Sequence, residues 1–395
     1  MNTNIIKVVG LLVVLSAASH AKAQTVDAAA ASGGVQLLAQ TATTPDMTDA
    51  RFEKFVPKAN PVGTQIDYTI WDEALNYFVF RMGKSIRESA PRPEPGLGTR
   101  RIYGHDSRFR MEGNRVIFSY LEDEIIASLT EYREDLERTG DIVDISTLSK
   151  NEQLAFWINL HNTAIIEQIA LAYPVSQPIS LKIGDSGLTL DEAPFITVAG
   201  VQMSPKDIRT KIVYPNWSNP KVIYGFFRGE IGGPSIQNEA YKARNVSDLL
   251  DKTGKDFVNS LRGTQKSGSN LLVSEIYEEA RPYFFPQWPT DLKAHLRSFA
   301  DTDLVSMLDE TTSVRANIYE HDIADLANGE RDPNYGYLLV DGQRRVERVP
   351  TAIARLLQER SNKVEKLIKR NDLVGLVTLI PFDDPSNPTV PEVVE

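Results

Sequence analysis

The segment LSKNEQLAFWINLHNTAIIEQIALAYP, residues 148–174, decides the fold. Its apolar residues cover most of a helix circumference rather than a single stripe, which indicates a helix buried on nearly all sides. Ser149 stands three residues before Glu152, the spacing of a capping box, and Pro174 closes the run. We therefore expect a buried helix over residues 154–173, with the other elements packed around it.

Four polar residues lie inside this predicted helix: Asn159, His161, Asn162 and Glu167. A buried polar group without a hydrogen-bond partner costs about 1–3 kcal/mol, so each of these side chains needs a partner if the helix is buried. The helix is therefore either a core element with a polar network or the floor of a binding site. The sequence leaves both interpretations open.

The N-terminus carries the three-part pattern of a cleaved secretory signal. A lysine at position 7 precedes the apolar run 8–15, and Ala-Lys-Ala ends at Ala23, just before Gln24. The run is too short to cross a bilayer. Cleavage after Ala23 leaves 395 − 23 = 372 residues and, because two lysines are removed, a formal charge of 41 − 53 = −12. We expect a periplasmic or secreted protein; a buried N-terminal helix is the alternative.

Composition excludes several classes of function. The chain has no cysteine, so disulfides, zinc–thiolate sites and a cysteine nucleophile are impossible. The net charge of −10 argues against a nucleic-acid partner. No other apolar run approaches the roughly 20 residues of a membrane helix, so we expect no membrane span. We expect no cofactor either, and the oligomeric state stays open.

Outside the central helix, the pattern predicts an α+β domain, mostly helical, with a small antiparallel sheet around the buried helix. Helical spacing recurs over residues 68–89, 121–138, 205–212, 246–261, 290–300 and 350–370. We expect Gly140 to end the helix that begins at residue 121. Short alternating segments predict the sheet at 179–183, 188–190 and 200–203. Further strand-like runs are 115–120, 314–319, the hairpin 335–340 with 343–349 around Asp341-Gly342, and KVIYGFF at 221–227, the most strand-like of all.

The same patterns divide the chain into parts. After the signal sequence at 1–23, residues 24–50 are rich in alanine, threonine and glycine and are expected to be a flexible leader. The main domain is expected at 51–329 and a C-terminal extension of hairpin and helix at 330–372. Residues 373–395 are expected to be a tail that is disordered at its end.

The stretch EQLAFWINLHNTAII at 152–166 resembles the defining helix of the domain-of-unknown-function 547 family, whose usual form is close to EQLAFWINLYNA. Four further stretches resemble family motifs in the same order: GNRVIFSY at 113–120, residues 201–208, residues 235–258, and IYEHDIADLAN at 318–328. The resemblance covers about residues 68–329. It implies a domain of this family, whose function is largely unassigned.

Many family members carry an Asn-Cys-Gly…Ser-Cys-Pro loop and a histidine in the preceding short helix, which would suit a thiolate nucleophile and its base. The matching positions here are Arg228-Gly229, Gly232-Gly233-Pro234 and about Thr210. Both cysteines and the histidine are absent. The resemblance therefore implies a member that cannot perform thiol chemistry, and no other catalytic triad is evident.

Two groups of residues are candidate binding sites. Arg228, Glu230 and the glycines that follow could form an anion-binding concavity, or only a tight turn with an ion pair. His161, beside two asparagines and possibly near His321-Asp322, could be a zinc or iron ligand. Because no metal-binding histidine spacing occurs, a hydrogen-bonded core histidine is the better interpretation. Ser235 could be a serine nucleophile beside His161 or His321, but it lacks the Gly-x-Ser-x-Gly sequence of a nucleophile elbow.

We therefore predict an exported, non-catalytic domain that binds a small ligand or an envelope protein. The candidate binding residues are Asn159, His161, Asn162, Arg228, Glu230, His321 and Asp322. The first alternative is a hydrolase or transferase that uses Glu230, His161, His321 and Asp322. The second alternative is an assembly component whose C-terminal helix, with its apolar stripe and basic residues, pairs with another chain.

Overall fold

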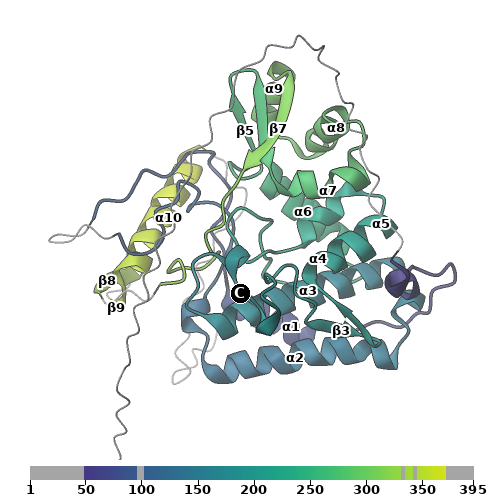
Figure 1. Ribbon diagram of the computed structural model, residues 1–395. Helices are drawn as coiled ribbons and strands as arrows, with labels where there is room; N and C mark the ends of the chain where they lie inside the picture. Colours follow the sequence, from purple (N-terminus) through teal and green to yellow (C-terminus); the bar gives the residue numbers. More distant parts are fainter. Residues whose placement is uncertain (1–48, 96–101, 331–333, 341–344, 371–395) are drawn as a thin grey trace, which may run out of the picture. The chain divides into compact units, whose positions relative to one another are not determined.

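The computed structural model describes residues 49–95, 102–330, 334–340 and 345–370 (Figure 1). The predicted signal sequence, the leader up to residue 48, the turn at Asp341-Gly342 and the tail lie outside these residues. The longer helices are α1 (Thr69–Phe78), α2 (Asp123–Ile142), α3 (Lys150–Ala172), α6 (Val246–Val258), α7 (Ile276–Phe284), α8 (Thr290–Phe299), α9 (Thr302–Glu310) and α10 (Thr351–Lys369). One-turn helices are α4 (Pro205–Asp207) and α5 (Tyr214–Asn216).

The strands are short, in keeping with the small sheet predicted for this α+β domain. They form two-stranded sheets β1–β2, β3–β4 and β8–β9 and one three-stranded sheet, β5–β6–β7. Their bounds are β1 (Val79–Phe80), β2 (Arg115–Val116), β3 (Ile196–Val198), β4 (Val201–Met203), β5 (Thr264–Ser267), β6 (Asn270–Ser274), β7 (Ser313–Ile318), β8 (Tyr335–Val340) and β9 (Arg345–Pro350). The prediction of a mostly helical domain with small sheets is confirmed.

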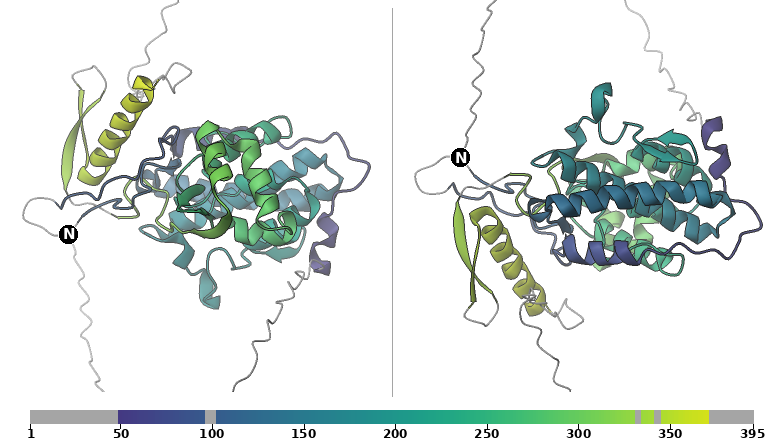
Figure 2. Two further views of the ribbon diagram at one scale, coloured as in Figure 1. Left: turned by 90° about the horizontal axis from the view of Figure 1, so that it is seen from above. Right: turned by 90° about the horizontal axis from the view of Figure 1, so that it is seen from below.

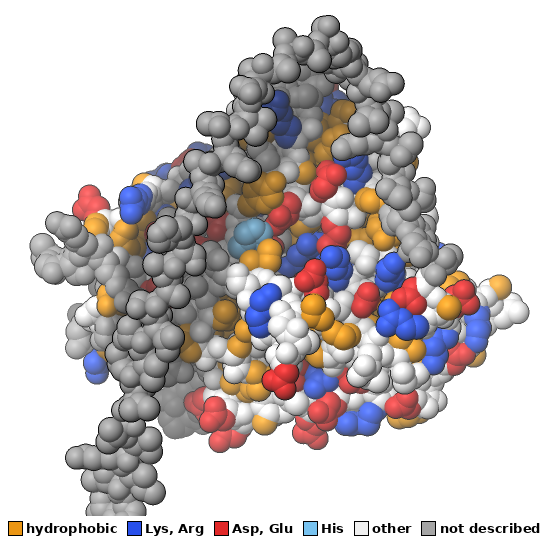
Figure 3. Space-filling model, viewed as in Figure 1, with side chains coloured by type: hydrophobic (Ala, Val, Ile, Leu, Met, Phe, Trp, Pro, Cys, Tyr) orange, Lys and Arg blue, Asp and Glu red, His pale blue; other side chains and the backbone are white. Residues whose placement is uncertain are grey.

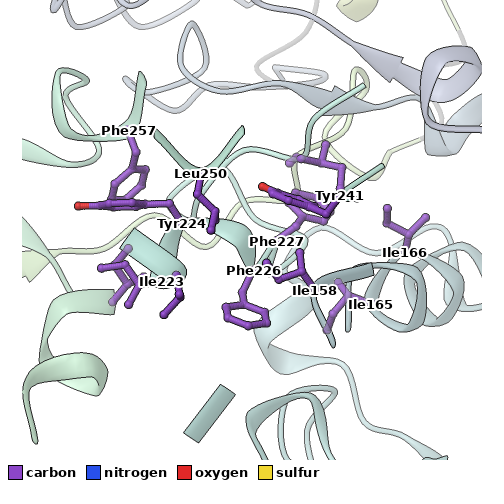
Figure 4. Packing of buried hydrophobic residues seen from close by; sticks show 14 of the residues in the cluster. Ile158, Ile165, Ile166, Ile223, Tyr224, Phe226, Phe227, Tyr241, Leu250 and Phe257 are labelled. Carbon is purple, nitrogen blue, oxygen red and sulfur yellow. The ribbon is translucent and has the colours of Figure 1, made fainter. Parts of the chain in front are cut away.

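Helix α3 is the buried central helix that its apolar pattern predicts. Phe156, Trp157 and Ile158 have no exposed surface, and α2 packs along α3 (Figure 1). Apolar side chains of α3, α6 and the segment before Arg228 meet in one cluster (Figure 4), including Ile158, Ile165, Phe226, Phe227 and Leu250. The Ser149 hydroxyl caps the helix by accepting from the Glu152 amide at 3.2 Å. The Glu152 carboxylate instead accepts from the Ile66 amide, so only half of the predicted capping box forms.

The prediction of a strand at KVIYGFF is wrong, because this segment is a 3-10 helix, η7 (Pro220–Gly225). Asn219 caps it by accepting from the Lys221 amide at 3.1 Å. The residues are apolar because they pack on α3: a Cβ at Gly225 would lie 2.7 Å from Ile158 Cδ1. Burial between helices and burial in a sheet produce the same short apolar run.

The end of α2 and the extent of the sheet predicted over residues 179–203 also differ from the prediction. Gly140 does not end α2, which continues to Ile142. A Cβ at Gly140 would lie 2.5 Å from Val198 Cγ1, so this glycine permits the close approach of β3. The predicted sheet over 179–203 is reduced to β3–β4, and its first two segments share only the bridge Lys182–Thr189.

The three-stranded sheet positions the candidate site. Strand β7 agrees with the predicted strand at 314–319, whereas the sequence analysis missed β5, β6, α7 and α9. Strands β6 and β7 run parallel, with Leu271 opposite Val314 and Val273 opposite Ala316. Their carboxyl ends therefore meet at the same edge of the sheet, which is the edge where parallel sheets commonly bind ligands.

The C-terminal extension has the predicted hairpin β8–β9 and the predicted helix α10. Figure 2 shows α10 lying along this hairpin in two views. The buried guanidinium of Arg110 donates to both carboxylate oxygens of Glu359 at 2.7 and 2.9 Å. Lys363 is also buried, and its ammonium donates to the Met111 carbonyl at 2.8 Å. Three further basic residues of α10, Arg355, Arg360 and Lys366, also donate to the protein's own chain.

In the described part of the chain, no helix combines the length and apolar character needed to span a membrane.

Candidate functional site

A cavity of about 360 Å³ opens between the carboxyl edge of the β6–β7 sheet, the segment after η7 and one side of α3. Its wall is half apolar and half charged. The apolar part comprises Ile165, Pro178, Ile179, Leu190, Ala316 and Tyr319. The charged part comprises Asp191, Arg228, Glu230, Glu275, Glu278 and Glu279.

Glu230, Glu275 and His321 come from three segments whose backbones pair with one another. Glu275 directly follows β6, and His321 follows β7 by three residues. The Glu275 amide donates to the Ile318 carbonyl at 3.3 Å, and Glu230 forms a backbone bridge with Ile323. A positive φ of 81° at Gly229 turns the chain into this bridge, where a Cβ would lie 2.3 Å from Ile169 Cδ1. The three side chains are thus carried by rigid backbone.

These three side chains form a compact acid–histidine cluster. His321 Nδ1 lies 2.9 Å from Glu230 Oε2 and 3.6 Å from Glu275 Oε1. The hydrogen bond to Glu230 is the main cause of a raised pKa of His321. Burial is the main cause of a raised pKa of the Glu275 carboxyl. One potential ligand atom from each of the three residues lies within 4.8 Å of the other two.

The floor of the cavity is a buried charge network centred on Arg209, which has no exposed surface. Its guanidinium donates to both oxygens of Asp191 at 2.7 and 2.8 Å and to both oxygens of Glu279 at 3.0 and 2.9 Å. Arg228 donates to Glu279 at 2.6 Å. Burial alone would raise the pKa of the Glu279 carboxyl, but the two guanidinium groups prevail and lower it to about 2. Asp191 and Glu279 therefore stay charged.

His161 lies behind Arg209 as a core residue of the network. Because an arginine can only donate, His161 Nε2 accepts from Arg209 at 3.0 Å, and the Nδ1–H donates to Asn162 Oδ1 at 3.1 Å. Burial and then the Arg209 charge lower the pKa of His161 to about 3, which keeps the ring neutral. Its isolation from solvent supports the core interpretation over a ligand role.

The two asparagines of α3 fasten neighbouring segments to the helix. The Asn159 amide donates to the Tyr241 carbonyl at 2.7 Å and accepts from the Tyr241 amide at 3.1 Å. Asn162 likewise donates to the Gly225 carbonyl and accepts from the Phe227 amide, both at 2.9 Å. These bonds satisfy the side-chain amides of both asparagines, and they position η7 and the chain leading to Arg228.

Of the predicted site residues, the structure places Arg228 and Glu230 in the wall of the cavity and His321 against Glu230. Asp322 is half-buried, and burial, followed by Glu320 and Asp106, raises the pKa of its carboxyl to about 6. Two of the loop amides are already used: Ile231 donates to the Asp322 carbonyl at 2.8 Å and Gly232 to the Glu320 carbonyl at 3.0 Å. Because the Arg228 guanidinium is bound to Glu279, few hydrogen-bond donors and little positive charge remain for an anion in this loop.

The carboxylates that dominate the cavity are ones the sequence analysis missed: Asp191, Glu275, Glu278 and Glu279. Three of them stand at the start of α7, in the segment SEIYEEA at 274–280. Acidic residues in a first helical turn are common, so this pattern carries no site signal by itself. On the face drawn in Figure 3, acidic and basic side chains are interspersed around one exposed histidine, without a continuous basic patch.

Comparison with protein families supports the resemblance found in the sequence. Residues 145–258 match the family model described as "Protein of unknown function, DUF547". This match contains α3, η7, Arg228 and Glu230, whereas Glu275 and His321 lie beyond it. No curated protein and no solved structure matched the chain.

Proposed function

We propose that this chain, whose residues 145–258 are a DUF547 domain, is a binding protein that takes a cation into the cavity beside Arg228. The charge balance of the wall carries this proposal. Five carboxylates and one guanidinium line the cavity, a formal balance of 1 − 5 = −4. Three partners outside the wall reduce this excess: Arg209, which binds Asp191 and Glu279, Arg281, which pairs with Glu278, and a protonated His321 together leave −4 + 3 = −1.

The excess is concentrated at one end of the cavity. Asp191 and Glu279 are neutralised by buried arginines, whereas Glu230 and Glu275 share a single histidine. Charges in a partly buried cavity interact more strongly than charges in water, because the surrounding protein screens them less. A positively charged group is therefore expected to bind at the Glu230–Glu275 end, with any apolar part of the ligand against Ile165 and Leu190.

Isothermal titration calorimetry of the mature protein near pH 7.4 tests the sign of the ligand. Cadaverine and glutarate have the same five-carbon length and opposite charges, and Zn²⁺ represents inorganic cations. We expect at least one of the two cations to bind and glutarate not to bind. Glu275→Gln should weaken cation binding about tenfold, the equivalent of roughly 1.4 kcal/mol. Asp185→Asn, which removes an exposed charge outside the cavity, should not. Glutarate binding that depends on Arg228, or no cation binding, would refute the proposal.

We also propose that the protein acts in the periplasm or outside the cell, with a small solute or an envelope protein as its partner. The support is the signal-like pattern of residues 1–23. N-terminal sequencing of protein recovered from the producing cells should find Gln24 first. An intact N-terminus on all of the protein would contradict export by cleavage.

A second candidate function, hydrolysis, is favoured by the Glu230–His321 pair. A carboxylate that holds one ring nitrogen leaves the other nitrogen to take a proton from water, as a general base does. Release of nitrophenol from p-nitrophenyl acetate, lost in His321→Ala but kept in Asp185→Asn, would support this function. Equal rates in both variants would dismiss it.

A further inference from the structure

The acid–histidine cluster defines a more specific ligand, and this step rests on the proposed cation binding. We infer that Glu230, Glu275 and His321 hold a divalent first-row transition-metal ion at the wall of the cavity. Each residue supplies one oxygen or nitrogen ligand, and because Glu230 and Glu275 line the cavity, we expect the remaining coordination positions to open toward it. A protein site with three ligands and open positions is the arrangement that leaves room for water or a second ligand.

The spacing of the ligand atoms fits such an ion. Metal–ligand bonds of about 2.0–2.2 Å place two ligands of a tetrahedral ion about 3.4 Å apart. His321 Nδ1 lies 2.9 Å from the Glu230 oxygen and 3.6 Å from the Glu275 oxygen, on either side of that value. The two carboxylates lie within 4.8 Å of each other, so a small side-chain rotation closes the site.

The backbone holds the three residues in place, and this observation is independent of their charge. Glu275 and His321 follow the carboxyl ends of two adjacent parallel strands, β6 and β7. Glu230 is bridged to the segment after β7, and the residue is only 5% exposed although it lines the cavity. Backbone hydrogen bonds next to paired strands hold ligands more precisely than free loops do, which favours a defined site over loose attraction between charges.

The donor set selects the class of metal. One imidazole nitrogen with two carboxylates suits Zn²⁺, Fe²⁺ or Mn²⁺, whereas Mg²⁺ and Ca²⁺ prefer oxygen ligands alone. The absence of cysteine from the chain removes the soft ligands that Cu⁺ prefers. The competing interpretation is that the protonated His321 ring alone serves as the counter-ion of Glu230 and Glu275. The two interpretations differ in what His321→Ala does to metal binding and to amine binding.

The experiment is competitive titration of Zn²⁺ into the mature protein against a chromophoric chelator, with cadaverine titrated in parallel. We expect one Zn²⁺ per chain. His321→Ala and Glu275→Gln should each weaken Zn²⁺ binding at least tenfold, consistent with the effect of losing a ligand. Glu278→Gln removes the same charge from the same cavity but no ligand, and should weaken binding no more than about threefold. Circular dichroism and urea unfolding confirm that each variant is folded.

The outcomes separate this inference from the proposed function. Cadaverine binding should survive His321→Ala, or tighten, because that change removes a positive charge from the site. If cadaverine binds and Zn²⁺ does not, the metal site is refuted while cation binding stands. If Glu278→Gln costs as much as Glu275→Gln, the attraction is diffuse and the metal site is refuted again. If neither cation binds, both proposals fail.

Discussion

At the scale of single residues, the buried network determines how the core responds to acid. A proton on Nε2 of His161 would point at the guanidinium of Arg209, so the folded protein resists protonation there. The pKa of the ring is about 3 in the folded protein and about 6.5 in an unfolded chain. Between these values only the unfolded chain gains the proton, and stability therefore falls as the pH is lowered below 6.5.

Replacing His161 by glutamine should remove this part of the acid sensitivity. The glutamine oxygen can accept from Arg209 as Nε2 does, and it gains no proton. Between pH 7 and pH 4.5, we expect the free energy of unfolding of the wild type to fall by roughly 2–3 kcal/mol more than that of His161→Gln. Urea unfolding at several pH values measures the difference. Parallel pH dependences in the two proteins would show that His161 is not held neutral.

Arg209 is fully buried and neutralises two partly exposed carboxylates, so its loss should be costly. Arg209→Met would leave Asp191 and Glu279 without their shared partner. Removing one member of a buried ion pair costs about 3–5 kcal/mol, and we expect a loss of this size in the free energy of unfolding. Arg138→Met breaks an exposed ion pair on α2 and should change stability by less than about 1 kcal/mol. Equal effects of the two substitutions would contradict the network.

At the scale of elements, the sequence predicts the long helices and fails on short apolar runs. Helix α3 is predictable because its apolar residues surround it and Ser149 marks its start. The segment KVIYGFF is not predictable in this way, because a short, mostly apolar run fits a buried 3-10 helix as well as a strand. Only Glu275 separates strand β6 from helix α7. The alternating pattern of the strand therefore runs into the helical pattern, and neither period is clear in the sequence. Tertiary packing decides such segments.

Helix α10 tests whether the C-terminal extension belongs to the domain. The Glu359 carboxylate accepts two bonds from buried Arg110, so Glu359→Ala should weaken the docking of α10. We expect faster amide hydrogen exchange across Thr351–Lys369, and no such change on replacing the exposed Glu365. Unchanged exchange in Glu359→Ala would mean that the other contacts of α10, among them the bond from Lys363 to Met111, hold the helix without this ion pair. Firm docking would disfavour the alternative in which α10 pairs with another chain.

At the scale of the whole molecule, the candidate site joins segments far apart in the chain. The sequence motifs supply Arg228, Glu230 and His321, because the family resemblance draws attention to their segments. Asp191 and Glu275 come from segments without a motif, and only the parallel pairing of β6 with β7 brings Glu275 beside His321. Without this pairing, an arginine next to glycines allows either an anion-binding concavity or a tight turn with an ion pair. The folded chain adds carboxylates, so the wall of the cavity carries an excess of negative charge.

Anomalous diffraction tests the sign of the ion in the cavity most directly, with one crystal soaked in Zn²⁺ and another in bromide. The account predicts a zinc peak bounded by Glu230, Glu275 and His321, and no bromide peak inside the cavity. A bromide ion beside Arg228, with the carboxylates of the cavity free of metal, would contradict it.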